Sequence, residues 1–299
     1  MPPIVCQPVS EVDFDTFTAA FNHAYSDYFL PTVMTPASFR ALMVRDDLDP
    51  DTSVAALDNG IIVGTGLLGI RDRTGWIGGM GVIPERRRQG IGRQMMDYLL
   101  HRAREHHLTE VALEVIEKNL GAHKLYRQVG FTEQRYLLVL DREPGTLPDR
   151  LHSPFQIESR PLEELLEYYE AFHDIPNCWQ RALPSLAGLG IHHVQGWAAL
   201  DNHEIVGYAI GWANTQVLRL VDFATKPAAH RVAIAQTLLT HIHRQFPEAY
   251  GDCYNIAEDD PVLPAYEALR YTVLFRQIEM RLALNQGGTA HTPLPHAHL

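Results

Sequence analysis

The sequence predicts a protein of mixed α and β structure made of two tandem domains of one kind. An internal repeat is the first sign, because the pattern LDN-x-x-IVG of residues 57–64 returns at residues 200–207. Length is the second, since 299 residues are too many for one such domain and suffice for two, each with its own core. An apolar content of 46% supports a folded globular chain.

Hydrophobic spacing predicts the elements of the first domain in order. They are a strand near Val5, helices at 13–25 and 36–45, strands at 53–57, 61–69 and 76–82, a helix from Ile91, a strand at 110–116, a helix at 122–129 and a closing strand at 136–140. A similar apolar strand at 278–282 closes the second domain. Strands and helices therefore alternate late in a domain but not early.

Proline and glycine mark the expected boundary between the domains, because Pro144-Gly145, Pro148 and Pro154 interrupt a polar stretch. We expect the first domain at 1–143, a linker at 144–154, the second domain at 155–285 and a flexible tail at 286–299.

Composition limits the possible partners. A formal net charge of -11 argues against nucleic acid and favours cationic substrates. Three widely spaced cysteines show no pairing or metal spacing, and the histidines lack partners at ligand spacing, so we expect a reducing cytoplasm and no metal. The absence of a basic, apolar leader and of a spanning apolar run predicts no membrane association. Either a monomer or a homodimer fits.

The most informative motif is the segment Val82 to Gly92, VIPERRRQGIG, at the joint between a strand and a helix. Gly90 and Gly92 remove side chains where a diphosphate would touch the backbone, and the first N–H groups of the new helix have no internal acceptor. The motif lacks the third glycine of the dinucleotide fingerprint and the Gly-Lys-Ser/Thr of the other phosphate loop. An ordinary solvated arginine run is the structural alternative.

This segment resembles the acetyl-CoA signature of the GCN5-related N-acetyltransferases, Val-x-Pro-x-x-Arg/Gln-x-x-Gly-x-Gly/Ala. Val82, Pro84, Arg87, Gly90 and Gly92 fill its fixed positions. A second block, the strand 111–116 followed by Asn119, Ala122, Leu125, Tyr126, Gly130 and Phe131, is similar to the protein N-terminal alanine acetyltransferases of the same superfamily. The resemblance covers roughly residues 5–140 and is densest at 76–131.

The resemblance implies a mixed, strongly twisted sheet flanked by helices in each domain, with acetyl-CoA held where two strands splay apart after Val82. The glycines at 78, 79 and 81 suit that irregularity. The expected cofactor contacts are Val82, Arg87, Arg88, Gln89, Gly90, Ile91, Gly92 and Asn119. For Asn119, capping of the next helix is the alternative.

Glu114 and Tyr126 are the candidate catalytic residues. Transfer of an acetyl group to an amine needs a proton acceptor, and Glu114 matches the glutamate that serves as base in the protein-acetylating relatives. Apolar neighbours would raise its pKa, although a purely structural carboxylate fits equally. Tyr126 matches the acid that protonates the CoA thiolate, but it also lies on an apolar helical stripe, so a core tyrosine is the alternative.

The first helices usually grip the acceptor in this family, and residues 21–31 are rich in aromatic side chains. Tyr25, Tyr28 and Asp27 are therefore candidate substrate residues, with Asp27 attracting an ammonium group, although aromatics near a helix end also simply pack. The acceptor is expected to be the primary amine of a small molecule or peptide. A CoA-binding scaffold without turnover, or acylation of a hydroxyl or thiol, remains possible.

The second domain repeats the pattern without its chemistry. At the repeat's offset, Ala233 and Ala235 replace the two glycines and the arginines thin out. Arg270 replaces Gly130 and Tyr254 replaces Glu114, whereas Tyr266 matches Tyr126. We expect a degenerate domain with a structural or acceptor-shaping role.

Overall fold

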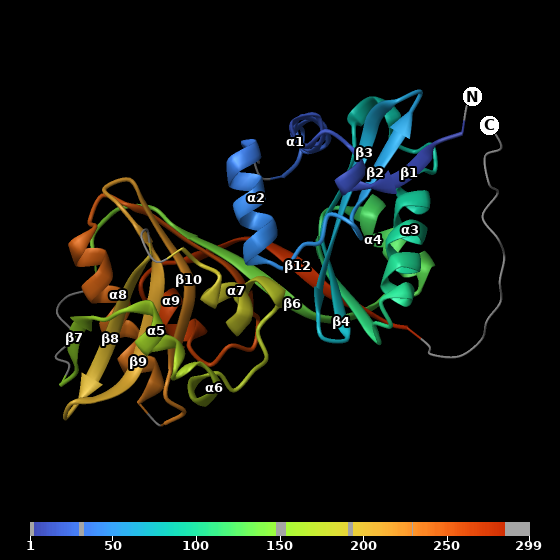
Figure 1. The fold of residues 1–299 in the computed structure, drawn as a ribbon. Helices are drawn as coiled ribbons and strands as arrows, with labels where there is room; N and C mark the ends of the chain where they lie inside the picture. Colours follow the sequence, from blue (N-terminus) through green and yellow to red (C-terminus); the bar gives the residue numbers. More distant parts are fainter. Residues whose placement is uncertain (1–2, 30–32, 148–153, 191–193, 229, 285–299) are drawn as a thin grey trace.

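A computed structural model describes residues 3–29, 33–147, 154–190, 194–228 and 230–284. Two lobes share one 12-stranded mixed sheet of order β1-β2-β3-β4-β5-β12-β6-β11-β10-β9-β8-β7 (Figure 1). The tail at 286–299 and the middle of the expected linker, 148–153, lie outside the described residues.

The N-terminal lobe contains the elements that the sequence predicts, with small shifts at their ends. They are β1 (Val5–Pro8), α1 (Phe14–Ala24), α2 (Pro36–Arg45), β2 (Val54–Asp58), β3 (Ile61–Arg71), β4 (Thr74–Val82), α3 (Ile91–Glu105), β5 (Glu110–Ile116), α4 (Leu120–Val129) and β6 (Thr132–Arg142). Side-chain caps explain three helix starts, because Asp13, Thr35 and Asn119 each accept a hydrogen bond from a first-turn N–H group.

The C-terminal lobe repeats the order of the strands and of the later helices, and it has several short helices between its first two strands. Its elements are β7 (Gln156–Ser159), α5 (Leu162–Leu166), α6 (Tyr169–Phe172), the 3-10 helix η3 (Trp179–Arg181), α7 (Leu183–Ala187), β8 (Gln195–Asp201), β9 (Glu204–Ala213), β10 (Val217–Thr225), α8 (Arg231–Gln245), β11 (Tyr250–Ala257), α9 (Leu263–Ala268) and β12 (Thr272–Ala283). The predicted class, with two tandem units of one kind, is confirmed.

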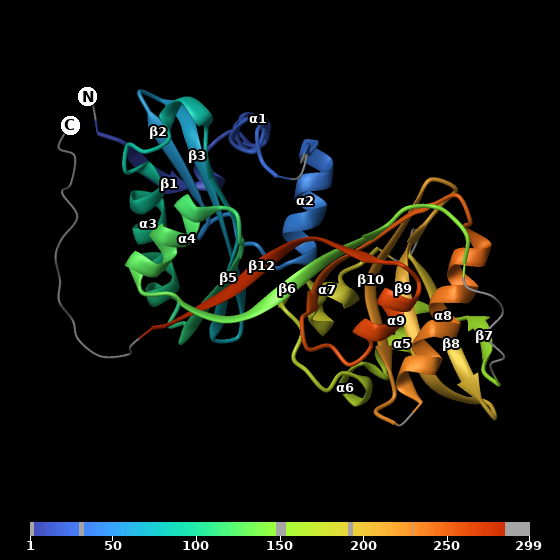
Figure 2. The same ribbon diagram turned by 180° about the vertical axis from the view of Figure 1, so that it is seen from behind.

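The two lobes exchange their closing strands. β12 of the C-terminal lobe pairs antiparallel with β5, and β6 of the N-terminal lobe pairs antiparallel with β11. β6 and β12 also pair with each other along most of their length, and both views show them crossing together between the lobes (Figures 1 and 2). The sequence predicted one sheet in each domain, whereas the exchange joins the two into a continuous sheet.

Helices cover both faces of the N-terminal half of the sheet. α3 and α4 pack on one face against Val111, Leu113 and Val115 of β5, while α1 and α2 pack on the other against Trp76 and Ala112. β5 alternates between these faces, as its sequence predicts.

Strands β4 and β5 form a cleft because they separate after Trp76, six residues before the point after Val82 that the resemblance implied. Their parallel pairing covers only Thr74 to Trp76 against Glu110 to Ala112, after which both strands continue unpaired with each other. The β3–β4 register shifts opposite Gly78, where a Cβ atom would lie 2.0 Å from the Trp76 ring. The glycines therefore allow the irregular strand that the sequence predicted.

Candidate acetyl-CoA and acceptor site

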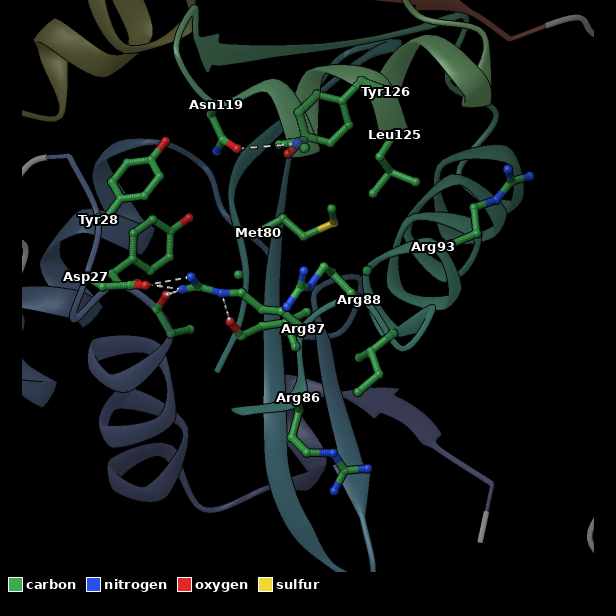
Figure 3. A pocket seen from close by; sticks show the side chains of 18 of the residues that line it. Asp27, Tyr28, Met80, Arg86, Arg87, Arg88, Arg93, Asn119, Leu125 and Tyr126 are labelled. Carbon is green, nitrogen blue, oxygen red and sulfur yellow. Dashed lines mark hydrogen bonds and ion pairs between the residues drawn. The ribbon is translucent and has the colours of Figure 1, made fainter. Parts of the chain in front are cut away.

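A cavity of about 510 Å³ lies at this splay, between the end of β4, the start of α3, α4 and the end of α1 (Figure 3). The predicted site residues that line it are Tyr25, Asp27, Tyr28, Val82, Arg87, Arg88, Gly90, Ile91, Gly92, Asn119 and Tyr126. Two predicted residues, Gln89 and Glu114, are not part of the lining. One cavity thus joins the cofactor loop to the proposed acceptor residues.

The loop between β4 and α3 has the backbone of an anion site. Gly90 is the N-cap of α3 with a left-handed φ of 82°, and no side chain caps the helix. The first N–H groups of this 15-residue helix therefore remain free for a ligand. A Cβ atom on Gly92 would meet only Leu125, at 3.5 Å, so the space beside the backbone is open. The diphosphate of acetyl-CoA fits this donor set.

The three loop arginines have different surroundings. Arg86 is paired with Asp58, and Arg87 donates to both carboxylate oxygens of Asp27 at 2.7 and 2.6 Å and to the carbonyl oxygens of Val82 and Ala24. Within the described part of the chain, Arg88 forms no ion pair and is exposed, with a φ of 60°. Arg88 is therefore the loop cation available to a phosphate, while Arg87 ties the loop to α1.

The pairing with Arg87 changes the expected role of Asp27. Hydrogen bonds from Arg87 hold the pKa of Asp27 below its usual range. The charge that was expected to attract an ammonium group is thus already compensated. Its visible contribution is to fix the end of α1 beside the cofactor loop (Figure 3).

Three phenols gather at the other end of the cavity. Tyr25 and Tyr28 pack edge to face with ring centroids 5.0 Å apart, and Tyr126 reaches the same space from α4. Burial raises the pKa of all three, and the neighbouring phenols add to the effect for Tyr25 and Tyr126. A hydrogen bond with Asn119 acts in the opposite direction on Tyr28. All three hydroxyls are therefore protonated at neutral pH.

Asn119 and Tyr126 make the contacts expected of the structural alternatives, and both also line the cavity. The Asn119 side chain caps α4 by accepting from the Ala122 N–H at 3.3 Å, and it also lines the cavity. Tyr126 is 6% exposed and packs with Phe131 in the core, yet it lines the cavity as well. Packing holds the ring in place next to the cavity.

Glu114 faces the opposite side of β5 from the α3–α4 core, toward the C-terminal lobe. Its Oε2 accepts a hydrogen bond from the Trp76 indole at 2.8 Å. Its Oε1 is buried and makes no hydrogen bond within the described residues. Burial is the main cause that raises the pKa of this carboxyl to about 7. The group therefore titrates in the range useful for a base, at the root of the splay rather than in the cavity wall.

The corresponding place in the C-terminal lobe is almost filled. A cavity of only about 20 Å³ remains between the end of β10, the start of α8 and the α6 region. Arg231, the first residue of α8, is paired there with Asp174. The replacement of glycine by Ala233 and Ala235 is not the direct cause, because both alanines lie inside α8. The loop itself is shorter, and α8 begins right after His230, whose φ is -101°.

Sequence reasoning missed the residues that the C-terminal lobe brings to Glu114. Trp179 of η3 stacks on Trp76 with ring centroids 5.9 Å apart, and Gln180 is among the groups that lower the pKa of the Glu114 carboxyl. The segment precedes the part of the second domain where the repeat is visible, so alignment of the two copies gave no signal for it.

Membrane-spanning helices, metal-binding groups and disulfides were not expected from the sequence. No helix among the described residues has the length and apolar character needed to cross a membrane. In the same part of the chain, no group of three or more His, Cys, Asp or Glu side chains is placed to hold a metal ion. The three cysteines are unpaired.

Comparison with known proteins agrees with the geometry. The model of the acetyltransferase (GNAT) family matches residues 12–131. No curated protein matches the chain significantly. The fold is similar to that of a tandem GNAT protein from the clavulanic acid biosynthesis pathway, with 15% identity over 96% of this chain and 100% of that one and a TM-score of 0.68.

Two other solved structures show the same two-lobed likeness. A putative acetyltransferase from Pyrococcus horikoshii has 16% identity over 95% of this chain and 91% of its own, with a TM-score of 0.68. A GCN5-related N-acetyltransferase from Sphaerobacter thermophilus has 16% identity over 95% and 97%, with a TM-score of 0.66. Residues 12–131 therefore belong to the acetyltransferase (GNAT) family, and the chain is an acetyl-CoA-dependent acyltransferase with the fold of a tandem GNAT protein.

Proposed function

We propose that the protein transfers the acetyl group of acetyl-CoA to a primary amine of a small molecule or peptide. The observation that carries this proposal is the single cavity of about 510 Å³ in which the start of α3 and the phenol cluster meet. A cofactor bound at the helix start would extend toward Tyr126 and Tyr28. The net charge of -11 favours a cationic acceptor.

Two residues of the chain are proposed to move protons. Acetyl-CoA supplies the acetyl group as a thioester; the new C–N bond forms as the C–S bond breaks. Glu114 accepts the proton that the amine loses, for which its pKa of about 7 is suited. Tyr126 donates its phenol proton to the departing thiolate, and the buried phenol stays protonated until then because burial raises its pKa.

A panel of acceptors tests the reaction type. The chain is incubated with acetyl-CoA and equal concentrations of primary amines, amino-terminal peptides, alcohols and thiols, while thiol release and product mass are followed. We expect acetylated amines. Products on oxygen or sulfur would change the acceptor class, and acetyl-CoA binding without any thiol release across the panel would favour a scaffold.

The pH dependence tests the proposed base. A general base acts when deprotonated, so kcat/KM with the best amine should rise with pH through a midpoint near 7, where Glu114 titrates. Glu114→Gln should remove this limb and lower the rate about 10²-fold. If the rate of the variant still rises with pH near 7, the titrating group is the amine itself or another residue.

We also propose a cytoplasmic location, because the three cysteines are unpaired, and a division of the sequence at 144–154. A monomer and a homodimer both remain compatible with this proposal.

A further inference from the structure

The side chain of Arg87 joins the cofactor loop, residues 83–90, to the end of α1. Its terminal nitrogens donate to the two carboxylate oxygens of Asp27 at 2.7 and 2.6 Å and to the Ala24 carbonyl at 3.0 Å. Its Nε donates to the Val82 carbonyl at 3.0 Å. All three guanidinium nitrogens are thus engaged between the last residue of β4 and the end of α1 (Figure 3).

Glycine in β4 allows the end of α1 to approach this closely. A Cβ atom on Gly81 would lie 3.0 Å from the Cβ atom of Ala24 and 3.1 Å from the Tyr25 ring. A second contact to the loop lies one turn earlier in α1, where His23 Nε2 is 3.3 Å from Glu85 Oε2. The last turn of α1 is therefore packed on the strand that leads into the loop and is bound to the loop itself.

The residues that follow this turn form one side of the cavity, which we call the aromatic wall: Tyr25, Tyr28 and Phe29. Their rings pack edge to face in series, with centroids 5.0 and 5.4 Å apart. The backbone N–H of Tyr25 donates to the Phe21 carbonyl and that of Tyr28 to the Tyr25 carbonyl, both at 3.1 Å. Since Asp27 lies within this short segment, its contact with the loop sets where the wall stands.

We propose that Asp27 is a positioning residue for acceptor binding: through Arg87 it couples the aromatic wall to the cofactor loop. A diphosphate bound at the first N–H groups of α3 holds the loop in place, and the loop then holds the end of α1. Acetyl-CoA should therefore raise the affinity for the acceptor, and the acceptor should raise the affinity for acetyl-CoA by the same factor. The inference rests on the proposed function, because it concerns the acceptor of that reaction.

The expected coupling is modest because the ion pair is partly exposed. The side chains of Arg87 and Asp27 are 39% and 52% exposed, and a pair of this kind changes an equilibrium by about threefold to fivefold at most. Asp27→Ala should therefore raise the KM for the best amine of the panel about threefold. It should leave kcat within about twofold, because neither Glu114 nor Tyr126 loses a contact. A general loss of structure would lower kcat as well.

Hydrogen exchange measures the coupling without an acceptor. The full-length protein is saturated with ADP, which carries the diphosphate of CoA but not its pantetheine arm, and amide exchange is followed by mass spectrometry. In the wild type we expect slower exchange at the start of α3 and, by about threefold, at residues 25–28. In Asp27→Ala the slowing at α3 should persist, whereas the slowing at residues 25–28 should be lost.

Asp58→Ala is the matched control, because Asp58 pairs with Arg86 of the same loop but lies at the end of β2. It also removes the carboxylate partner of one loop arginine, yet the response of residues 25–28 to ADP should remain. Arg87→Gln breaks the proposed contact from its other side and should match Asp27→Ala. The variant with both changes should have no higher acceptor KM than either single variant.

The results separate this inference from the proposed function. If ADP does not slow exchange at residues 25–28 in the wild type, or slows it equally in Asp27→Ala, the coupling alone is overturned. If the rise in acceptor KM in Asp27→Ala adds to that in Arg87→Gln, Asp27 contacts the acceptor directly and is not a positioning residue. If neither ADP nor acetyl-CoA slows exchange at the start of α3, the phosphate site is overturned, and the proposed function with it.

Discussion

The two lobes keep the same order of strands but differ in the connection that follows the fourth strand. In the N-terminal lobe, residues 83–90 separate β4 from α3, and a cavity of about 510 Å³ opens beside them. In the C-terminal lobe, only residues 226–230 separate β10 from α8, and about 20 Å³ remains. The order of the strands is therefore kept with the shorter connection, whereas the cavity is not.

Asp222 is the centre of a buried polar cluster in the C-terminal lobe. Asp222 is buried and accepts hydrogen bonds from Tyr208 at 2.7 Å and Arg181 at 3.0 Å, while His173 lies 3.1 Å away. Burial alone would raise the pKa of Asp222, but His173 and Arg181 lower it to about 2. These mutual hydrogen bonds stabilise a closed interior, in contrast to the free N–H groups at the start of α3.

The largest effect is expected when the N-terminal lobe is produced without the C-terminal lobe. A fragment of residues 1–143 lacks β12, the neighbour of β5, so the sheet behind Glu114 is incomplete. A typical domain is stable by only about 5–15 kcal/mol, so the loss of a paired strand can unfold it. Circular dichroism and calorimetry should show a poorly folded fragment without acetyl-CoA binding.

Removal of residues 285–299 alone is the control for that truncation and should leave folding and binding unchanged. A fragment 1–143 with native acetyl-CoA affinity would mean that β6 can take the place of β12 beside β5.

The loop comparison predicts a large effect at one helix start only. Gly90→Val places a β-branched residue at a φ of 82°, which costs roughly 1–2 kcal/mol and displaces the N–H groups that bind phosphate. Acetyl-CoA affinity should fall by about 10²-fold or more. His230→Val, at the start of α8, is the matched control. Equal affinities for both variants and the wild type, measured by calorimetry, would exclude the loop as the phosphate site.

Tyr126 and Tyr266 occupy equivalent positions in the two lobes, so their variants compare the chemistry of the lobes. Tyr126→Phe should lower kcat about 10²-fold with little change in acetyl-CoA affinity, because its phenol serves only the departing thiolate. Tyr266→Phe, at the equivalent and 1% exposed position of the C-terminal lobe, should leave kcat unchanged. A loss in both variants would indicate a structural role for the phenol that the two lobes share.

The smallest effect is expected for acetyl-CoA binding at the cavity of the C-terminal lobe. Titration calorimetry should give one acetyl-CoA per chain, since about 20 Å³ cannot admit a cofactor. Two sites of similar affinity would show that the C-terminal lobe opens in solution.

Local features of the fold and site could be predicted from the sequence. The spacing of Gly90 and Gly92 fixed the loop and the helix start because backbone freedom is a property of the residue itself. The strand exchange could not be predicted, since β6 and β12 are equivalent copies with similar apolar patterns and either can fit beside β5. For the same reason, Glu279 opposite Glu114 was not foreseen.

The ion pair between Asp27 and Arg87 could be predicted from the sequence only in part. Both residues were identified as members of the site, but their mutual hydrogen bonds depend on how α1 packs on the loop. From its charge alone, Asp27 was expected to be free to attract the acceptor. In the folded chain its carboxylate is bound by Arg87 instead.

The exchange of β6 and β12 also bears on how the chain is made. Because β5 leaves the ribosome long before β12, the edge of β5 lacks its native partner until β12 has been synthesised. Pairing at such sequence separation slows folding and leaves the nascent chain exposed to aggregation. In the folded chain, β6 and β12 each complete the sheet of the other lobe and pair with each other. The arrangement resembles a domain-swapped dimer whose two subunits have been fused into one chain.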